Sequence, residues 1–189
     1  MSHLLQNSGS LGADLRSIRK SRGITLIDMS ETLGRSVGWM SQVERNISAP
    51  SIDELRSISK VLDVPLSIFF GQTKTEATEV GRVVRKGTRR KIGGGTNGLV
   101  EELLSPDLTD DFEVIHSVFE PGAALQDFLT RPTQEVGYII SGRLTVWIGD
   151  QKFDLETGDS FRIREEPHKW ANPHAEKAVV IWVIAPPVY

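Results

Sequence analysis

Two short apolar repeats of helical spacing, separated by a glycine, occupy residues 25–46. Each repeat has three apolar residues at positions i, i+3 and i+7: Leu26, Met29 and Leu33 in the first, and Met40, Val43 and Ile47 in the second. This spacing predicts two amphipathic helices, which need an abrupt corner between them. Gly34 can adopt the left-handed conformation that ends the first helix, and Ser36 can cap the second. Such a corner is typical of a helix-turn-helix, whose second helix lies in the major groove of DNA.

Further helices are predicted on both sides of this corner. The apolar residues Leu11, Leu15 and Ile18 recur at helical spacing in residues 11–22, and Gly23 ends that helix. Two capping signals, Thr25-x-x-Asp28 and Ser51-x-x-Glu54, open the second and fourth helices. The apolar stripe of the fourth helix is Ile52, Leu55, Ile58 and Leu62. Pro65 then suits the first turn of a short fifth helix that ends at residues 69–71.

Three spaced motifs within residues 11–71 resemble the phage-repressor-like (XRE-class) helix-turn-helix domain. They read Leu-Arg-x-Ile-Arg-Lys-x-Arg-Gly before the corner, Met-Ser-Gln-Val-Glu-Arg-Asn within the second helix, and Pro-Ser-x-x-x-Leu after it. The resemblance implies a five-helix, all-α domain that binds double-stranded operator DNA.

The resemblance also implies which residues face DNA. Those expected in the groove are Ser36, Val37, Gly38, Trp39 and Gln42, and those expected at phosphates are Thr25, Arg35, Arg45 and Asn46. Trp39 has a second interpretation, in which it folds back onto its own domain. Glu44 is assigned to an internal salt bridge or cap, because phosphates would repel a carboxylate that faced them.

The pattern changes to period two from Leu99 onward. Seven short strands are expected, at residues 99–104, 112–119, 135–140, 143–148, 151–155, 160–163 and 178–184. Glycine-containing turns separate them at Gly122, Gly142, Gly149 and Gly158. Short antiparallel strands at this spacing favour a sandwich or barrel. The fold class is therefore α+β in two domains, with an all-β domain at residues 98–189.

The order of residues in this second domain resembles the cupin family, a double-stranded β-helix barrel. Gly122, Glu135 and Gly142 fit the first cupin motif, and Gly158, His168 and Asn172 fit the second, although Glu156 replaces the usual proline. Leu129 and Arg131 stand where the family has its two metal-binding histidines. Only two of four ligands remain, and a guanidinium replaces an imidazole, so we expect no metal, no cofactor and no enzymatic activity. His116, Asp127, Gln134 and His174 are the possible substitute ligands.

The expected barrel mouth contains Arg131, Glu135, His168 and Trp170, which suit a small polar, anionic effector. Two interpretations of Arg131 stay open: its cation pairs with Glu135 in place of the lost metal, or it binds an effector carboxylate or phosphate. Trp147, Trp182 and Tyr138 are assigned to core or rim packing. Arg162 and Arg164 share one face of a strand and are either solvated or part of the mouth.

Charge is distributed unevenly along the chain. Residues 1–71 carry 8 basic and 7 acidic groups, residues 72–95 carry 7 and 2, and residues 96–189 carry 7 and 16. The acidic second domain would be repelled by DNA. The basic run at 82–91 is either an arm along the phosphate backbone or a solvated first strand that carries Val83, Val84 and Ile92.

These features predict a one-component transcription regulator. The expected parts are a disordered arm at 1–10, a DNA-binding domain at 11–71, a basic linker with a first strand at 72–97, and an effector-binding cupin at 98–189. A homodimer that reads a pseudo-palindromic operator is expected. There is no cysteine, no secretion signal and no apolar run of membrane-spanning length, so a cytoplasmic protein is expected. The rival hypothesis is a metal-dependent cupin enzyme with a helix-turn-helix head, similar to hydroxypropylphosphonate epoxidase.

Overall fold

The chain divides into two compact units, one helical and one built of strands. The structure is a computed structural model that describes residues 10–64, 66–69, 76, 78–79, 81–92, 98–106, 108 and 110–187. The first unit comprises Met1–Arg90 with Ser105–Asp110, and the second comprises Lys91–Leu104 with Asp111–Val188. This organisation agrees with the predicted two-domain α+β class. Most of the predicted N-terminal arm, residues 1–9, lies outside the described residues.

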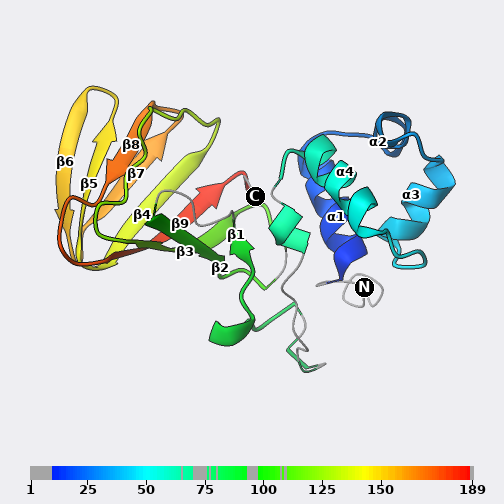
Figure 1. Cartoon of the computed structure of the whole chain (residues 1–189), viewed down its shortest axis with the longest axis horizontal. Coiled ribbons are helices and arrows are strands. Elements are labelled where there is room, and N and C mark those ends of the chain that lie inside the picture. The colour runs from blue at the N-terminus through cyan, green and yellow to red at the C-terminus, as the bar shows by residue number, and fades with distance from the viewer. Residues whose placement is uncertain are drawn as a thin grey trace. The chain divides into compact units, whose positions relative to one another are not determined.

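The first unit contains four α-helices among its described residues (Figure 1). They are α1 (Leu11–Ser21), α2 (Leu26–Leu33), α3 (Val37–Glu44) and α4 (Ile52–Leu62). Ser10, which was assigned to the arm, is the N-cap of α1, and its hydroxyl accepts a hydrogen bond from the Ala13 amide at 3.3 Å. Both predicted capping boxes are confirmed, Thr25 with Asp28 and Ser51 with Glu54.

The prediction of a fifth helix is wrong. Leu66–Phe69 forms a single 3₁₀ turn, η1. Four residues are too few to close an α-helical ladder, and the tighter i→i+3 turn suits such a short segment. Pro65, Phe70 and Gly71, which were expected to begin and end this helix, lie outside the described residues.

The helices pack around a small apolar core. Its fully buried members include Leu15, Ile18, Met29, Met40, Val43, Ile58, Leu62 and Ile68. Gly12 lets α1 approach α3 closely, because a Cβ at this position would overlap the backbone of Val43 and Glu44. Two predicted members of the apolar stripes do not join this core, since Ile47 is 64% exposed and Ile52 is 59% exposed. Ile47 follows the end of α3 at Glu44, and Ile52 is the first residue of α4.

The second unit is a sandwich of two antiparallel sheets (Figure 1). The larger sheet has the order β1-β2-β3-β9-β4-β7, with β1 at Lys91–Ile92, β2 at Leu99–Leu103, β3 at Glu113–Phe119, β9 at Ala178–Ala185, β4 at Gln134–Ser141 and β7 at Ser160–Arg164. The smaller sheet has the order β6-β5-β8, with β6 at Gln151–Glu156, β5 at Arg143–Ile148 and β8 at His168–Ala171. All seven predicted strands are present, with bounds that differ by at most one residue at either end. Strand β8 was not predicted as a strand.

The core of this unit lies between the two sheets. Its buried residues include Ile115, Phe119, Ile139, Leu144, Val146, Ile163, Val180 and Trp182. The turn glycines that separate the strands all have positive φ, from 55° at Gly149 to 98° at Gly158. At Gly142 a side chain would also collide with the Lys177 backbone, so this turn requires glycine.

The basic segment at 82–91 differs from the predicted first strand. Strand β1 contains only Lys91–Ile92, whereas Val83 and Val84 lie outside it and Lys86–Thr88 forms a 3₁₀ turn, η2. Arg90 is buried, and its Nη2 lies 2.6 Å from Asp14 Oδ2 on α1. Its Nη1 donates to the Ile68 carbonyl at 3.2 Å. This anchor holds the segment on the helical unit up to the residue before β1. Gly93–Gly95, the predicted flexible turn, lies outside the described residues.

Candidate functional site

The corner between α2 and α3 has the predicted local geometry. Gly34 has φ 62° and ψ 34°, in the left-handed region, and its amide donates to the last turn of α2. Ser36 Oγ accepts a hydrogen bond from the Trp39 amide at 3.1 Å and so caps α3. At the start of α2, Thr25 Oγ1 donates to Asp28 Oδ2 at 2.5 Å. Hydrogen bonds from Thr25 to the carboxylate hold the pKa of Asp28 below its usual range.

Helix α3 has one buried side and one exposed side. Met40 and Val43 are buried, whereas Ser36, Val37, Gly38, Gln42 and Arg45 are exposed. Arg45 Nε donates to the Ser41 carbonyl at 3.1 Å, which directs this side chain along the helix. Five of the residues expected to face DNA are therefore exposed to solvent.

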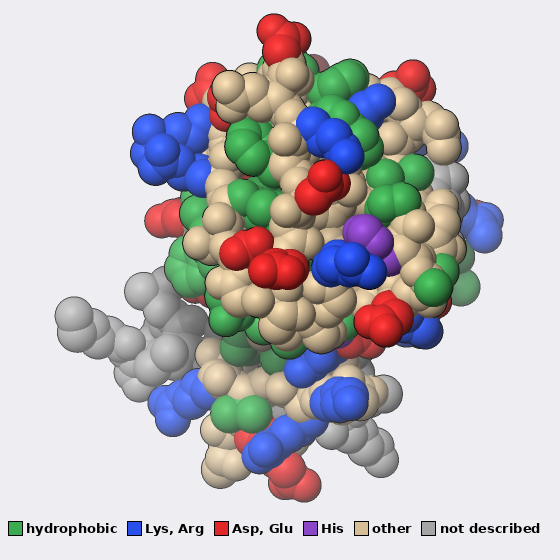
Figure 2. Space-filling model, turned by 90° about the vertical axis from the view of Figure 1, so that its left-hand side faces the viewer, with side chains coloured by type: hydrophobic (Ala, Val, Ile, Leu, Met, Phe, Trp, Pro, Cys, Tyr) green, Lys and Arg blue, Asp and Glu red, His purple; other side chains and the backbone are tan. Residues whose placement is uncertain are grey.

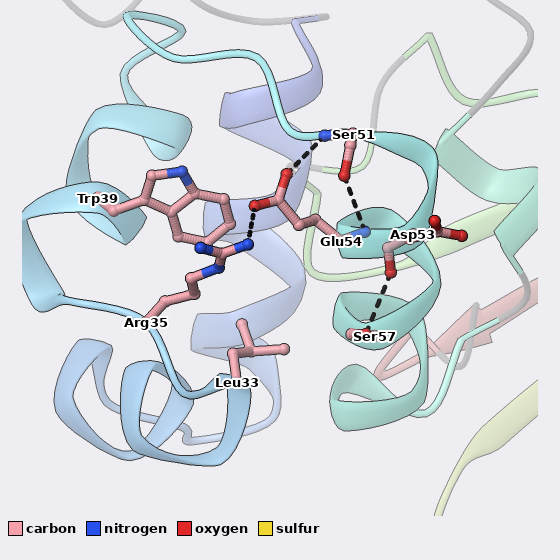
Figure 3. A pocket seen from close by; sticks show the side chains of 7 residues that line it. All are labelled: Leu33, Arg35, Trp39, Ser51, Asp53, Glu54 and Ser57. Carbon is pink, nitrogen blue, oxygen red and sulfur yellow. Dashed lines mark hydrogen bonds and ion pairs between the residues drawn. The ribbon is translucent and has the colours of Figure 1, made fainter.

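Arg35, Trp39 and Glu54 form a cluster beside this surface (Figure 3). Arg35 Nη2 lies 2.7 Å from Glu54 Oε1, and its guanidinium carbon lies 5.4 Å from the centroid of the Trp39 ring. The same glutamate accepts a hydrogen bond from the Ser51 amide at 2.7 Å, and this bond is the main reason why its pKa is lowered. The three side chains line a pocket of about 230 Å³ with Leu33, Ser51, Asp53 and Ser57. Arg35 and Trp39, both expected at DNA, are thus held by contacts within the domain.

The side chain of Asn46, which was expected to contact a phosphate, instead forms hydrogen bonds with the start of α1. Its Oδ1 accepts a hydrogen bond from the Gly12 amide at 2.9 Å, and its Nδ2 donates to Ser10 Oγ at 2.8 Å. The residue has φ 58°, a conformation that asparagine tolerates better than most residues. Asn46 therefore joins the end of α3 to the start of α1.

The predicted internal salt bridge of Glu44 is confirmed. Arg19 on α1 binds its carboxylate through two nitrogens, and both residues are buried. The remaining nitrogen of Arg19, Nη1, donates to the Ile24 carbonyl at 2.7 Å. This pair fixes α3 on α1 and keeps the carboxylate away from the exposed side of α3.

In the second unit, the residues at the cupin metal positions do not fit a metal. The backbones of Leu129 and His168 exchange two hydrogen bonds of 2.9 and 2.8 Å, which places the aliphatic Leu129 beside the histidine. His168 Nδ1 lies 3.0 Å from the Glu166 carbonyl. Among the described residues, no group of three or more histidines or carboxylates could hold a metal ion.

A cluster of charged residues lies within the barrel. Glu135 is buried on β4 and accepts a hydrogen bond from Thr133 Oγ1 at 2.7 Å. Glu101 on β2 accepts one from Ser117 Oγ at 3.0 Å. Burial raises the pKa of Glu101, the Ser117 bond and the Arg131 charge lower it, and the charge of Glu135 raises it further. Glu101, Arg131 and Glu135 are thus close enough to interact electrostatically.

Sequence reasoning missed Glu101 and Ser117. Their signal was available, because Glu101 occupies the inward-facing position between Leu99 and Leu103 in a period-two strand. Ser117 lies directly opposite it in the register of β2 and β3. A glutamate at such a position is a buried carboxylate, which is a stronger site signal than an exposed one.

The contacts in the structure bring together only some of the four residues expected at the barrel mouth, which are Arg131, Glu135, His168 and Trp170. Trp170 is partly buried and packs edge-on against Phe119 of the core, with ring centroids 4.7 Å apart. Trp182 is also in the core, edge-on to Phe161 at 5.0 Å. Within the part of the chain that the structure describes, Arg131 forms no ion pair with Glu135. The pairing that was one interpretation of Arg131 is therefore absent from this conformation.

Among the described residues of the second unit, the face on the β6 side has no large area of single charge. Figure 2 shows acidic and basic side chains interspersed among apolar and uncharged ones.

Among the described helices, none has the length and apolar character that a membrane span needs.

Two family profiles match the chain, one described as helix-turn-helix over residues 15–69 and one described as cupin domain over residues 115–184. HTH-type transcriptional regulator PuuR of Escherichia coli is 24% identical over 168 residues, which are 87% of this chain and 88% of PuuR. Transcriptional regulator ClgR of Mycobacterium tuberculosis is 30% identical over 86 residues, which are 46% of this chain and 77% of ClgR. A solved structure of an HTH_3 family transcriptional regulator from Vibrio cholerae aligns with a TM-score of 0.45 and 21% identity, over 96% of this chain and 97% of that one. The chain therefore belongs to the XRE-type helix-turn-helix transcriptional regulators that carry a C-terminal cupin domain.

Proposed function

We propose that this regulator binds operator DNA through the exposed side of α3 and that its cupin senses a small polar molecule without a metal. The observation that carries the first part is the separation of α3 into a buried side and an exposed side. Gln42 is suited to pair with an adenine edge, and Val37 is suited to contact a thymine methyl group. Arg45 is suited to a phosphate, a contact that fixes position rather than sequence, whereas Arg35 is paired with Glu54 and is available to a phosphate only where that ion pair is broken.

The charged cluster inside the barrel supports the sensing role. A domain that only joined two DNA-binding heads would have no need to bring the buried Glu135 close to the partly buried Glu101 and Arg131, because removing charges from water costs free energy. An anionic effector would bind Arg131 in competition with these two carboxylates. Ligand binding that changed operator affinity by a coupling of about 1–3 kcal/mol would be enough for a switch.

A homodimer is the proposed binding unit, because a single head of this size contacts too little DNA for tight and specific binding. The protein would act in the cytoplasm, where its DNA target lies. Leu129 and Arg131 argue against the epoxidase-like alternative, since neither side chain supplies a ligand for iron. Stoichiometric iron retained by the purified protein would restore that alternative.

Two measurements test this proposal. Selection from a random DNA pool should enrich one sequence with two symmetric half-sites, bound by two protomers; enrichment of no sequence would refute operator recognition. A thermal-shift screen of organic acids, amino acids, polyamines and phosphorylated metabolites should find a ligand that stabilises the wild type but not Arg131→Ala. Equal stabilisation of that variant would remove Arg131 from the effector site.

A further inference from the structure

The larger sheet of the second unit has an apolar surface on the side that faces away from the core. Along β4, the buried Glu135, Gly137 and Ile139 face inward and alternate with exposed residues that face outward. The same alternation holds on the neighbouring strands. The apolar residues that face outward, here called the outer apolar face, are Val100 of β2, Val114 and Val118 of β3, Val136, Tyr138 and Ile140 of β4, and Val179, Ile181 and Val183 of β9.

The outer apolar face is continuous across four strands. Residues that pair in an antiparallel register place their side chains next to each other on the same side of the sheet. The register forms rows from Val100 to Val118 and Val179, from Ile181 to Tyr138, and from Val114 to Val183 and Val136. These residues therefore form one surface and are not scattered apolar side chains.

The outer apolar face is large enough to be an interface. Its five most exposed members, Val100, Val136, Tyr138, Ile140 and Val183, are each more than a third exposed. With the partly buried members, the face presents on the order of 500 Å² of apolar surface, at the upper end of what a monomer usually leaves uncovered. Together with the polar residues around it, the face approaches the roughly 800 Å² per partner of a standard interface.

The charge of the second unit also favours contact at this face. Residues 96–189 carry 16 acidic and 7 basic groups, so two copies of this unit repel each other over most of their surfaces. Every residue of β2, β3, β4, β7 and β9 is described, and Glu102 is the only carboxylate among those that face outward. Two copies can therefore meet at the outer apolar face with little repulsion between carboxylates.

The charged residues of the outer surface lie at its two edges, and their positions favour one orientation of a second copy. Arg162 and Arg164 lie on β7 at one edge, and Glu102 pairs with Lys91 of β1 at the other. A two-fold axis that ran across the strands would place the arginines of one copy over those of the other. An axis that runs along the strands instead places them over the edge that holds Glu102, which avoids this repulsion.

We propose that the outer apolar face binds a second copy of this chain, with the two larger sheets packed face to face about a two-fold axis along their strands. Face-to-face packing with nearly aligned strands is one of the two common arrangements of β-sheets. A second copy fits because a two-fold interface uses the same surface of each partner, so each apolar face is covered by the other. This inference rests on the proposed homodimer and assigns its interface to the cupin.

Analytical ultracentrifugation of the full-length protein tests the proposal. We expect a wild-type dimer with a dissociation constant of about 1 μM or lower. Tyr138→Glu and Val183→Glu, at exposed positions on neighbouring strands, should each raise this constant at least about 100-fold, because each would bury a carboxylate against an apolar partner. Far-UV circular dichroism should show that both variants keep the fold, since these side chains do not belong to the core.

Two matched controls carry the same change elsewhere. Phe128→Glu lies in the loop between β3 and β4, Ile47→Glu lies on the helical unit, and both positions are exposed. Both variants should dimerise as the wild type does. A dimer that persists in Tyr138→Glu and Val183→Glu would overturn this interface and leave the proposed homodimer standing, whereas a monomeric wild type would overturn both. Unfolding of both sheet variants would show that the face is covered within one chain, which also contradicts the proposal.

Discussion

Arg19 and Glu44 join α1 to the last turn of α3 by a buried, two-point ion pair, with Nε–Oε1 at 2.5 Å and Nη2–Oε2 at 3.0 Å. Both side chains are less than a tenth exposed. Removal of either partner would leave the other charge buried without compensation. The orientation of α3 thus depends on a contact remote from its exposed side.

Glu44→Ala should destabilise the helical unit by about 3–5 kcal/mol, since it leaves the Arg19 guanidinium buried without a counter-charge. The double variant Arg19→Met with Glu44→Leu should lose much less, because no charge stays buried. Chemical denaturation followed by far-UV circular dichroism measures both. A double variant as unstable as Glu44→Ala would show that the contribution of the pair is not mainly the cost of an uncompensated charge.

Gly12→Ala should destabilise the same unit although alanine is the better helix former. The new methyl group would overlap the backbone of Val43 and Glu44, and overpacking of this kind typically costs about 1–3 kcal/mol. Gly38→Ala is the matched control, because a Cβ there meets only Ser36 Oγ, at 3.9 Å. We expect Gly38→Ala to be neutral or to stabilise by up to about 1 kcal/mol in thermal denaturation. Similar effects of the two variants would refute the close approach of α1 and α3.

Glu54→Gln should strengthen binding to DNA of any sequence and steepen its salt dependence. Glutamine keeps an acceptor for the Ser51 amide but loses the charge that holds Arg35, which is then available to a phosphate (Figure 3). One added phosphate contact raises the slope of log affinity against log salt by about 1. Ser51→Ala is the control: it removes the cap, costs about 1 kcal/mol of stability and leaves the salt slope unchanged. A salt slope unchanged in Glu54→Gln would exclude Arg35 from the phosphate contacts.

Glu101→Gln should stabilise the cupin at neutral pH. Burial raises the pKa of Glu101, so the folded state holds its proton more tightly than the unfolded state does. The ionised carboxylate therefore costs stability above the folded pKa, and this cost vanishes as the pH falls below the unfolded pKa, where both states are protonated. Melting temperatures should show a gain for the variant at pH 7 that disappears near pH 3. A gain that did not depend on pH would contradict the proposed cause.

Local signals made much of the fold predictable from the sequence. Gly34, with its left-handed φ, and the capping box of Thr25 with Asp28 depend on residues three or four apart, which sequence spacing shows directly. The contacts that were missed join residues far apart in the chain. Arg35 with Glu54 and Arg90 with Asp14 depend on how helices and segments pack, which no local pattern encodes.

In the candidate sites, too, local sequence patterns predicted the residues within one element but not the contacts between distant parts of the chain. The exposed residues of α3 could be predicted because helical periodicity separates them from Met40 and Val43. The barrel cluster could be predicted only in part, because the motif positions pointed to Glu135 and His168, whereas Glu101 comes from a strand outside the motifs. Trp170 was placed at the mouth by its position in the motif, and its edge-on packing against Phe119 of the core was not predicted.

Recognition of DNA by the exposed side of α3 is tested most directly by a comparison of Gln42→Ala with Arg45→Ala on the selected operator and on random DNA. We predict that Gln42→Ala reduces the ratio of operator affinity to random-DNA affinity by a factor equivalent to about 1–3 kcal/mol of binding free energy. Arg45→Ala should weaken binding to both DNAs to a similar extent and lower the slope of log affinity against log salt by about 1. If Gln42→Ala leaves this ratio unchanged while the variant stays folded, the exposed side of α3 does not read the operator sequence.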